Sequence, residues 1–420
     1  MTRDWITVFE ALRSVYIEGA YSNIAINEAA EHHKGCSVGF VRAFTKGVIR
    51  DSIQLDWFID KLAKKGIKSI KRKTLIILRM GIYAVNKLDS VPDHAAVNSS
   101  VNLAKKVSRG SEGFVNGMLR DYLRRKDTLF ADIDGNIALM YSFPQKLVDM
   151  ISEQYGEEAE CILKALSEPA PLVIRANTVK TGREELIEVL QTTGINAYAD
   201  DESRNGIICE GGSIISSEAF RNGLFSVQSL SSILAIEALD PQAGERILDM
   251  CAAPGGKSCA MAELMQDKGE ITACDIYEHR LELIKASADR LGLKSIETRL
   301  LDGTEHCAEF ENSFDRVLAD VPCSGLGVIQ GKPEIKLKED SFDFKELENI
   351  QAGILKNAIS YTVPGGIIEY STCTINREEN EMLVNRVLEE CSLVQILEMK
   401  TLLPYNNKVG FFYCIMKKSH

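Results

Sequence analysis

Hydrophobic residues recur at helical spacing through the first third of the chain. Val8, Leu12 and Val15 follow one another at intervals of three and four residues, and the same spacing returns within residues 75–85. Such spacing places apolar side chains on one face of an α-helix. The pattern therefore predicts that residues 4–126 are helical throughout.

Short apolar runs alternate with helical stretches in the rest of the chain. A small α+β unit at about 143–222 begins with two short helices, at 144–155 and 157–166. From Phe225 onward strands and helices alternate, which is typical of a doubly wound parallel sheet. The predicted strands there are 246–250, 270–275, a short run ending at 301, 316–319 and 366–370, the predicted helices are 229–238, 258–265, 278–291, 344–361 and 378–390, and a terminal hairpin ends at 411–415.

These changes of pattern divide the chain into three predicted domains. They are an all-α domain (1–126), a linker with a small α+β subdomain (127–222), and an α/β doubly wound, Rossmann-like domain (223–420). A chain of 420 residues is long enough for two or three domains, so this division is consistent with its length.

Composition argues against several classes of protein. Hydrophobic residues make up 45% of the chain, yet no stretch approaches 18 uninterrupted apolar residues, so no transmembrane helix is expected. The N-terminus shows no signal peptide. The eleven cysteines form no Cys-x-x-Cys pair and the six histidines show no ligand spacing, so we expect no metal site. Free thiols without an export signal favour a reducing cytoplasm.

Charge is distributed unevenly along the chain. The net charge of −11 argues against a nucleic-acid partner at first sight. Residues 1–140, however, carry 22 Lys and Arg against 15 Asp and Glu, whereas the remainder carries 27 against 45. A basic N-terminal domain is therefore joined to an acidic body, and the basic part is suited to binding phosphates.

The strongest chemical signal follows the predicted strand 246–250. Asp249 is followed by small residues, a Pro-Gly-Gly turn and the start of a helix. A strand, a glycine turn and a helix N-terminus bring a ligand against bare backbone N–H groups. A lone Gly-Gly is more often only a turn. Gly256-Lys257-Ser258 also matches the end of a nucleoside-triphosphate loop, but Cys251 stands where that loop requires a glycine.

The full run from Leu248 to Ser258 resembles motif I of the RNA cytosine-5 methyltransferases, Asp-x-Cys-Ala-Ala-Pro-Gly-Gly-Lys. The resemblance implies that S-adenosylmethionine is the cofactor. Asp275, at the end of the next strand, would accept hydrogen bonds from the ribose diol, and Asp302 would lie near the adenine amino group. Taken singly, each acid is more often a cap or turn residue. The residues implied to wrap the cofactor are Cys251, Ala252, Ala253, Pro254, Gly255, Gly256 and Lys257.

Two cysteines follow two later strands, in Asp320-Val321-Pro322-Cys323 and in Ser371-Thr372-Cys373-Thr374. In a doubly wound sheet these strand ends can lie side by side over one pocket. A single cysteine is usually a small buried apolar residue, but two beside a methyl-donor loop point to chemistry. A thiolate that adds to C6 of cytosine makes C5 nucleophilic enough to accept a methyl group. The site must then favour the thiolate, and Thr372, Thr374 or backbone N–H groups would supply that bias.

The family pattern implies a role for each of these groups. Cys373, in the Thr-Cys motif, would be the nucleophile, and Cys323, in the Pro-Cys motif, would assist release of the methylated product. Asp320 would stabilise the covalent adduct near N3 of the cytosine. A pair of cysteines in this order distinguishes the RNA enzymes of the family from the DNA enzymes.

Residues 4 to about 125 resemble the NusB-type RNA-binding helical domain. The resemblance is carried by Arg79-Met80-Gly81-Ile82-Tyr83, by Val91-Pro92 with the segment to Lys106, and by 114–120, with a departure at Asn98-Ser99-Ser100-Val101, where the family has Asn-Glu-Ala-Val. A cluster of cations in this region is either a solvated helix face or a contact to RNA phosphates. Its members are Lys61, Lys64, Lys65, Lys68, Lys71, Arg72 and Lys73.

Arg175-Ala176-Asn177 resembles the Arg-x-Asn motif of the family's small subdomain, although an ordinary strand end would read the same way. Three positions depart from the family. Ser229 follows Gln228 where an acid is usual, Gln330-Gly331 replaces two arginines, and Val409 replaces an aspartate. Single contacts to RNA from these positions are therefore in question.

Together the resemblances cover nearly the whole chain and imply a Sun/RsmB-type enzyme. Such an enzyme methylates C5 of a cytosine in small-subunit ribosomal RNA. Two alternatives stay open: a cytosine-5 methyltransferase of another RNA, such as transfer RNA, and a catalytically inactive RNA-binding assembly factor. We expect ribosomal RNA as the partner, no membrane association and a monomer.

Overall fold

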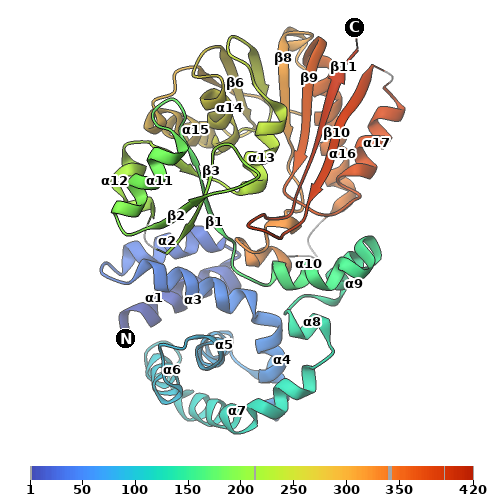
Figure 1. The fold of residues 1–420 in the computed structure, drawn as a ribbon. Coiled ribbons are helices and arrows are strands. Elements are labelled where there is room, and N and C mark those ends of the chain that lie inside the picture. The colour runs from blue at the N-terminus through green and yellow to red at the C-terminus, as the bar shows by residue number, and fades with distance from the viewer. Residues whose placement is uncertain (1, 212–213, 339–342, 392, 420) are drawn as a thin grey trace. The chain divides into compact units, whose positions relative to one another are not determined.

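The computed structural model describes residues 2–211, 214–338, 343–391 and 393–419 (Figure 1). The chain forms two compact units. The helical unit comprises Met1–Glu168 together with Ile329–Asp340, and the catalytic unit comprises Pro169–Val328 together with Ser341–His420. Residues 127–168 fall with the N-terminal helices in this division, whereas the sequence grouped them with the small subdomain. The boundaries at 126 and 222 stay a prediction.

Helices alone make up the regular structure described in the helical unit, as predicted. Val8 and Leu12 are fully buried, as the helical spacing required, and they share a core with Phe44, Phe58 and Tyr122. The helices are α1 (Thr2–Arg13), η1 (Ser14–Glu18), α2 (Ser22–His32), α3 (Val38–Arg50), α4 (Ser52–Leu62), η2 (Ile67–Ser69), α5 (Arg72–Lys87), α6 (Asp93–Val107), α7 (Glu112–Ile133), α8 (Ile137–Met140), α9 (Gln145–Tyr155), η3 (Gly156–Glu158), α10 (Ala159–Leu166) and η7 (Pro333–Leu337).

A small antiparallel sheet opens the catalytic unit, with strand order β2-β3-β1-β4. The third predicted domain began at residue 223 and so included the last strand of this sheet, β4, which the sequence indicated only as the segment leading into a helix. In the structure β4 pairs with β1, with Ala176 opposite Phe225. The elements are β1 (Leu172–Ala176), α11 (Arg183–Thr192), β2 (Asn196–Ala199), β3 (Gly206–Glu210), η4 (Ile214–Ser216), α12 (Glu218–Arg221) and β4 (Phe225–Val227).

The large sheet has seven strands in the order β10-β11-β9-β8-β5-β6-β7. From β9 to β7 every neighbouring pair is parallel, as predicted, whereas β11 runs antiparallel to both of its neighbours. The sheet is therefore mixed, because the terminal hairpin adds an antiparallel edge. The elements are α13 (Leu230–Leu239), β5 (Arg246–Asp249), α14 (Gly256–Leu264), β6 (Glu270–Asp275), α15 (Glu278–Leu291), β7 (Ile296–Leu300), η5 (Ala308–Phe310), β8 (Phe314–Asp320), η6 (Leu326–Val328), α16 (Phe344–Tyr361), β9 (Thr362–Thr372), α17 (Glu381–Glu389), β10 (Val394–Leu402) and β11 (Phe411–Lys418).

Helices cover both faces of this sheet (Figure 1). Successive residues of a strand point to opposite faces. Leu248 and Val317 accordingly pack in one core with α16 and α17, whereas Ile247 and Leu318 pack in another core with α13, α14 and α15. The carboxyl ends of the parallel strands consequently meet at one edge, where the predicted site residues lie.

Two predicted boundaries differ in the structure. The strand predicted at 366–370 begins earlier, at Thr362, so Pro364-Gly365-Gly366, which the sequence indicated as a turn into that strand, is an irregularity within β9, between the residue pairs Phe314–Thr362 and Arg316–Ile367. The last helix begins at Glu381 rather than at 378, so Glu379 lies in the preceding turn.

Two further classes of feature were searched for within the described residues. None of their helices is long and apolar enough to cross a membrane. Among the same residues, no group of three or more His, Cys, Asp or Glu side chains is arranged to hold a metal ion.

Candidate active site

The glycine turn joins β5 to α14. Gly255 adopts a φ of +98° as the residue that precedes α14, and a Cβ there would lie 3.0 Å from Cα of Ile284. Only glycine fits both restraints. The first N–H groups of a helix have no partner within the helix, so those of α14 are available to a ligand at this turn.

Asp249, at the end of β5, is fully buried beneath the turn. Ser258 donates a hydrogen bond from Oγ to its Oδ2 over 2.6 Å. Burial raises the pKa of Asp249 to about 7. Burial and the neighbouring carboxylates likewise raise the pKa of the Cys251 thiol, so this thiol stays protonated at neutral pH.

Asp275 and Asp302 follow β6 and β7. Asp275 is 3% exposed and accepts hydrogen bonds from Tyr277 N and from Arg280 Nη1, at 3.1 and 3.2 Å. Arg280 also donates to the carbonyl of Ala253 over 3.1 Å, so it joins this acid to the glycine turn. Asp302 Oδ1 accepts from N and Oγ1 of Thr304, which is the local turn that the sequence allowed as an alternative.

The chemistry of these groups fits S-adenosylmethionine. The ribose diol offers two O–H donors, and the carboxylate of Asp275 is an acceptor already oriented at a strand end. The bare start of α14 and the absence of side chains at Gly255 and Gly256 leave room for a ligand at the turn, since a Cβ on Gly256 would meet nothing within 4 Å. The predicted cofactor residues therefore lie around one turn, with Asp302 at the end of the outermost parallel strand.

Lys257 projects from α14 towards the end of β8. Its Nζ lies 2.6 Å from Oδ2 of Asp320, whose Oδ1 accepts from Ser371 Oγ over 3.1 Å. Burial opposes the charge on Lys257, but Asp320 and the sulfur of Cys373 outweigh that effect and raise its pKa. An ammonium ion is therefore held between the cofactor turn and the two cysteine loops.

The two predicted cysteines lie together. Cys323 Sγ is 3.3 Å from Cys373 Sγ, at the ends of the neighbouring strands β8 and β9. The hydrogen bond to Cys373 and burial raise the pKa of Cys323 well above its ordinary value. The threonine hydroxyls do not serve the thiolate as expected, because Thr372 donates to Asn380 over 2.6 Å and Thr374 is bonded to Ser324 over 2.8 Å. Lys257 is the nearby cation.

A buried carboxylate links the two cysteine loops, and the sequence did not single it out. Glu379 is fully buried and accepts from N and Oγ of Ser324, at 2.9 and 2.6 Å. It also accepts from Gln351 Nε2 and Asn376 Nδ2, at 3.0 and 3.2 Å. The sequence reasoning counted it among the first residues of a helix from 378; an acid directly after a Thr-Cys-Thr loop was the available signal.

The Arg-x-Asn motif joins the small sheet to the cofactor turn. Arg175 is 2% exposed and forms an ion pair with Glu263 of α14, Nε to Oε2 at 2.6 Å. Its Nη1 donates to the carbonyl of Gly256 over 3.1 Å. Asn177 donates from Nδ2 to the carbonyls of Gly223 and Leu291, both over 2.9 Å. These contacts make the motif internal support for the site.

Two of the departures from the family have local explanations. Ser229 caps α13, because its hydroxyl accepts from Ser232 N over 3.3 Å. Val409 is held through its backbone, whose carbonyl accepts from Ser231 Oγ over 2.6 Å. The next residue, Gly410, packs directly on Gly327, whose N–H donates to the carbonyl of Cys373 over 3.0 Å.

The third departure lies in the helical unit. Gln330 is 5% exposed and donates to the carbonyl of Ala165 over 3.0 Å, while Lys46 donates to the carbonyl of Gly331 over 2.7 Å. Lys336, six residues after Gln330, is 1% exposed and donates to the carbonyls of Arg50 and Ser142. Gln330 and Gly331 are therefore anchored in a helical core.

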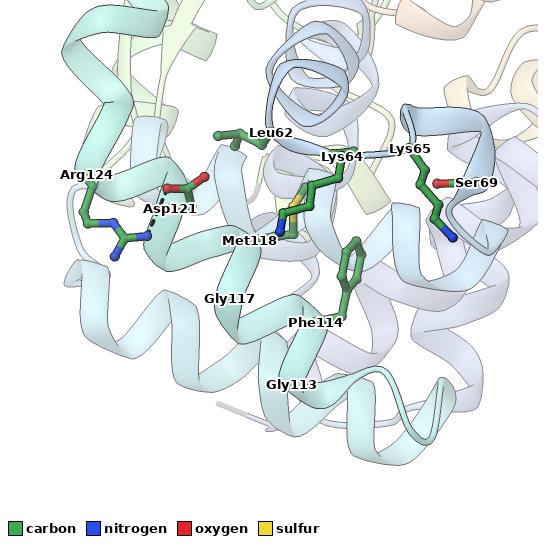
Figure 2. Close-up of a pocket in the computed structure, with 11 residues that line it drawn as sticks. Leu62, Lys64, Lys65, Ser69, Gly113, Phe114, Gly117, Met118, Asp121 and Arg124 are labelled. Atoms are coloured by element: carbon green, nitrogen blue, oxygen red, sulfur yellow. Dashed lines mark hydrogen bonds and ion pairs between the residues drawn. The ribbon is translucent and has the colours of Figure 1, made fainter.

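The cation cluster extends from the end of α4 through η2 to the start of α5, so it does not form the face of a single helix. Lys64 and Lys65 line a hollow of about 590 Å³, together with Phe114, which is 45% exposed. Figure 2 shows the ring of Phe114 beside these lysines, and the ion pair of Asp121 with Arg124 at another part of the wall. A second hollow, of about 420 Å³, is lined by Lys71, Arg109 and again Phe114.

Family models match three successive parts of the chain. The NusB family model matches residues 4–124, the model of the RsmF/B-like ferredoxin-like domain matches 143–215, and the model of the 16S rRNA methyltransferase RsmB/F matches 236–417. The first match lies within α1–α7, the second runs from α9 into η4 and so includes parts of both units, and the third runs from α13 to β11.

Curated relatives match over the whole length. The chain is 35% identical over 439 residues to the probable ribosomal RNA small subunit methyltransferase B of Bacillus subtilis, covering 97% of each chain. It is 32% identical over 417 residues to ribosomal RNA small subunit methyltransferase B of Proteus mirabilis, again covering 97% of each chain. The crystal structure of PH0851 has the same fold, with a TM-score of 0.84 at 23% identity over 100% of this chain and 99% of that one. These matches confirm the predicted class, an RNA methyltransferase that uses S-adenosylmethionine, and the chain belongs to the ribosomal RNA small subunit methyltransferase B family.

Proposed function

We propose that the enzyme methylates C5 of a cytosine in 16S ribosomal RNA, with Cys373 as the nucleophile and Cys323 as the residue that assists product release. One observation carries this proposal. The two sulfur atoms lie 3.3 Å apart at neighbouring strand ends, beside the ion pair of Lys257 and Asp320. A non-catalytic fold has no need for two thiols and an ion pair at this edge of the sheet.

Addition of a thiolate solves the chemical problem of this reaction. C5 of cytosine is a weak nucleophile, and attack of the Cys373 thiolate on C6 moves the C5–C6 π electrons towards C5. Lys257 favours the charged sulfur by its positive charge. S-adenosylmethionine supplies an electrophilic methyl group from its sulfonium when held by Cys251–Lys257, Asp275 and Asp302.

Asp320 and Cys323 serve the later stages. Asp320, held by Lys257 and Ser371, is positioned to share a hydrogen bond with N3 of the cytosine ring and so stabilise the adduct. After methylation, a base removes the proton from C5, and the released electron pair breaks the bond between C6 and the Cys373 sulfur. Cys323 assists this elimination from its position next to the leaving sulfur.

The cations of the helical unit supply the contact with the RNA backbone. Lys64, Lys65 and Lys71 are exposed and lie beside the solvent-facing ring of Phe114. Cations neutralise phosphates, and an exposed aromatic ring offers a surface on which an unpaired base can stack.

We further propose that the enzyme acts as a monomer in the cytoplasm, with domains divided near residues 126 and 222.

Two cysteine variants test the mechanism directly. Cys373→Ala removes the nucleophile, so methyl transfer to 16S ribosomal RNA should fall by about a thousandfold or more, with no covalent complex. Cys323→Ala leaves addition intact but impairs release, so a protein–RNA adduct should persist on a denaturing gel. Cys161→Ala, which removes an exposed cysteine on α10, is the matched control and should behave like the wild type.

Each contrary result has a distinct meaning. An adduct in the Cys373 variant but not in the Cys323 variant would reverse the two roles. Transfer of tritium from S-adenosylmethionine to deproteinised transfer RNA, and not to small-subunit ribosomal RNA, would overturn the substrate. Cofactor binding without transfer to either RNA would instead indicate an assembly factor that binds RNA.

A further inference from the structure

Glu379 lies between the two cysteine loops and forms hydrogen bonds with residues of both. Both of its oxygens accept hydrogen bonds from Ser324, the residue directly after Cys323. Asn376, three residues after Cys373, donates to Oε1, and Gln351 donates to Oε2. Gln351 Nε2 also reaches the carbonyl of Pro322, directly before Cys323, over 3.0 Å. The carboxylate thus fixes the backbone on both sides of one thiol and the loop after the other.

The charged groups beside the two sulfurs differ. On the side of Cys373 stands the ammonium ion of Lys257, held by Asp320. Cys323 faces two carboxylates, Glu379 and Asp320, in addition to the neighbouring sulfur. A negative charge nearby opposes ionisation of a thiol, and a positive charge favours it. The two cysteines are therefore not electrostatically equivalent, although they lie 3.3 Å apart.

We propose that Glu379 is the positioning residue that decides which of the two cysteines ionises. It holds Cys323 against Cys373 and keeps Cys323 in the thiol form, so that the Cys323 S–H donates a hydrogen bond to the Cys373 sulfur and only Cys373 is free to attack. The division of labour between the cysteines, which rests on the proposed function, then has a physical origin in the carboxylate that joins their two loops.

Other groups around Cys323 either also oppose ionisation of its thiol or are too weak to favour it. Tyr370, whose hydroxyl donates to the carbonyl of Glu379 over 2.6 Å, is buried and has a raised pKa, so it stays neutral. Burial raises the pKa of Cys323 independently of any charge. Among the described neighbours, Lys257 is the cation that bears on this pair, and it acts on Cys373.

Alkylation of the thiols tests the proposal without RNA or cofactor. In a Cys373→Ala background, the rate at which iodoacetamide modifies Cys323 is followed by peptide mass spectrometry from pH 6 to pH 10. Replacing Glu379 by Gln removes one negative charge at nearly constant size, so Cys323 should be modified about tenfold faster at pH 8. In the chain with both cysteines, Glu379→Gln should lower kcat for methyl transfer by about tenfold and leave KM for S-adenosylmethionine unchanged.

Glu378 provides a matched control, because it is exposed and carries the same charge one residue away. Glu378→Gln should leave both measurements unchanged. Glu379→Asp keeps the charge but shortens the side chain, so it should preserve the pH profile of Cys323 while still lowering kcat. A profile of Cys323 that Glu379→Gln does not move would overturn the proposal, because a purely structural clamp would not alter a titration.

A variant that keeps Glu379 covers the case in which Glu379→Gln does not fold. In the Cys373→Ala chain alone, Cys323 should titrate above the ordinary cysteine pKa of about 8.5, because the carboxylates and burial persist. A titration below that value would refute the proposal. Failure of methyl transfer in all chains, with the alkylation results as expected, would refute the proposed reaction and leave the role of Glu379 intact.

Discussion

Arg175 in the catalytic unit and Lys336 in the helical unit are both almost fully buried, yet they are stabilised differently. Arg175 faces the carboxylate of Glu263 and keeps its charge, since that carboxylate outweighs the effect of burial and raises its pKa. Lys336 donates to two carbonyls, and burial lowers its pKa to about 7, although Asp51 opposes the shift. A buried cation that is bonded directly to a carboxylate stays charged, whereas one whose hydrogen-bond partners are carbonyls is ready to lose its proton near neutral pH.

The largest expected loss of folding stability comes from replacing Arg175. Arg175→Met leaves Glu263 buried without its partner and removes the bond to Gly256 of the cofactor turn. Breaking a buried ion pair in this way costs about 3–5 kcal/mol, so urea denaturation should show a loss of that size. Calorimetry should show weaker binding of S-adenosylmethionine as well.

The double variant Arg175→Met with Glu263→Leu is the control for this prediction. It removes both charges together, and apolar replacement of a buried pair is often nearly neutral, so most of the lost stability should return. Equal stability of the wild type and Arg175→Met alone would show that the ion pair does not stabilise the contact between the small sheet and α14.

The pH dependence of folding stability distinguishes Lys336 from Arg175. Its pKa is about 7 in the folded chain and near the ordinary lysine value of 10.5 when unfolded, so between these values the unfolded chain binds more protons. The wild type should therefore gain stability as the pH rises through this window. Relative to Lys336→Met, which cannot titrate, the free energy of unfolding should shift in favour of the wild type by about 2 kcal/mol between pH 7 and pH 9.

Lys332→Met is the appropriate control, because Lys332 is exposed and lies only four residues away. Because Lys336 is retained in this variant, its free energy of unfolding should rise with pH in parallel with that of the wild type. A difference between the wild type and Lys336→Met that is constant across this range would mean that Lys336 remains charged in the folded chain, like Arg175.

Exposed cations give the smallest effect on folding and the clearest effect on RNA. Replacing Lys64 and Lys65 by Ala should change the free energy of unfolding by less than about 0.5 kcal/mol. Filter binding of a 16S ribosomal RNA transcript across a KCl series should show a salt dependence reduced by about one to two phosphate contacts. The same pair of changes at Lys105 and Lys106, which line neither hollow, should leave that slope unaltered.

Much of the site could be predicted because its parts are neighbours in the sequence or follow a general rule. The glycine turn occupies eleven consecutive residues, and Cys323 and Cys373 meet because parallel strands end at one edge of the sheet. Alternating patterns likewise gave the strands and helices, with errors where Pro364 to Gly366 and Glu379 resembled a turn and a helix start.

The residues and contacts that the sequence did not predict depend on partners far away in the chain. Glu379 binds groups at 324 and 351, and Arg175 reaches Glu263 across 88 residues. Lysine is rarely buried, so nothing local marked Lys336 as part of a core. Sequence patterns report how each segment folds locally, and they do not report which distant polar groups complete a carboxylate or an ammonium ion.

The stretch from Ile329 to Lys338 has a consequence for how this protein can be divided. The chain leaves the catalytic unit six residues after Cys323, places Lys336 against the carbonyls of Arg50 and Ser142, and then returns. A fragment cut at residue 168 would therefore lack an inner piece of its own helical core, and the remaining fragment would carry that piece with nothing to cover it. The helical unit is therefore assembled from two stretches of the chain that are separated by 160 residues of the catalytic unit, from Pro169 to Val328.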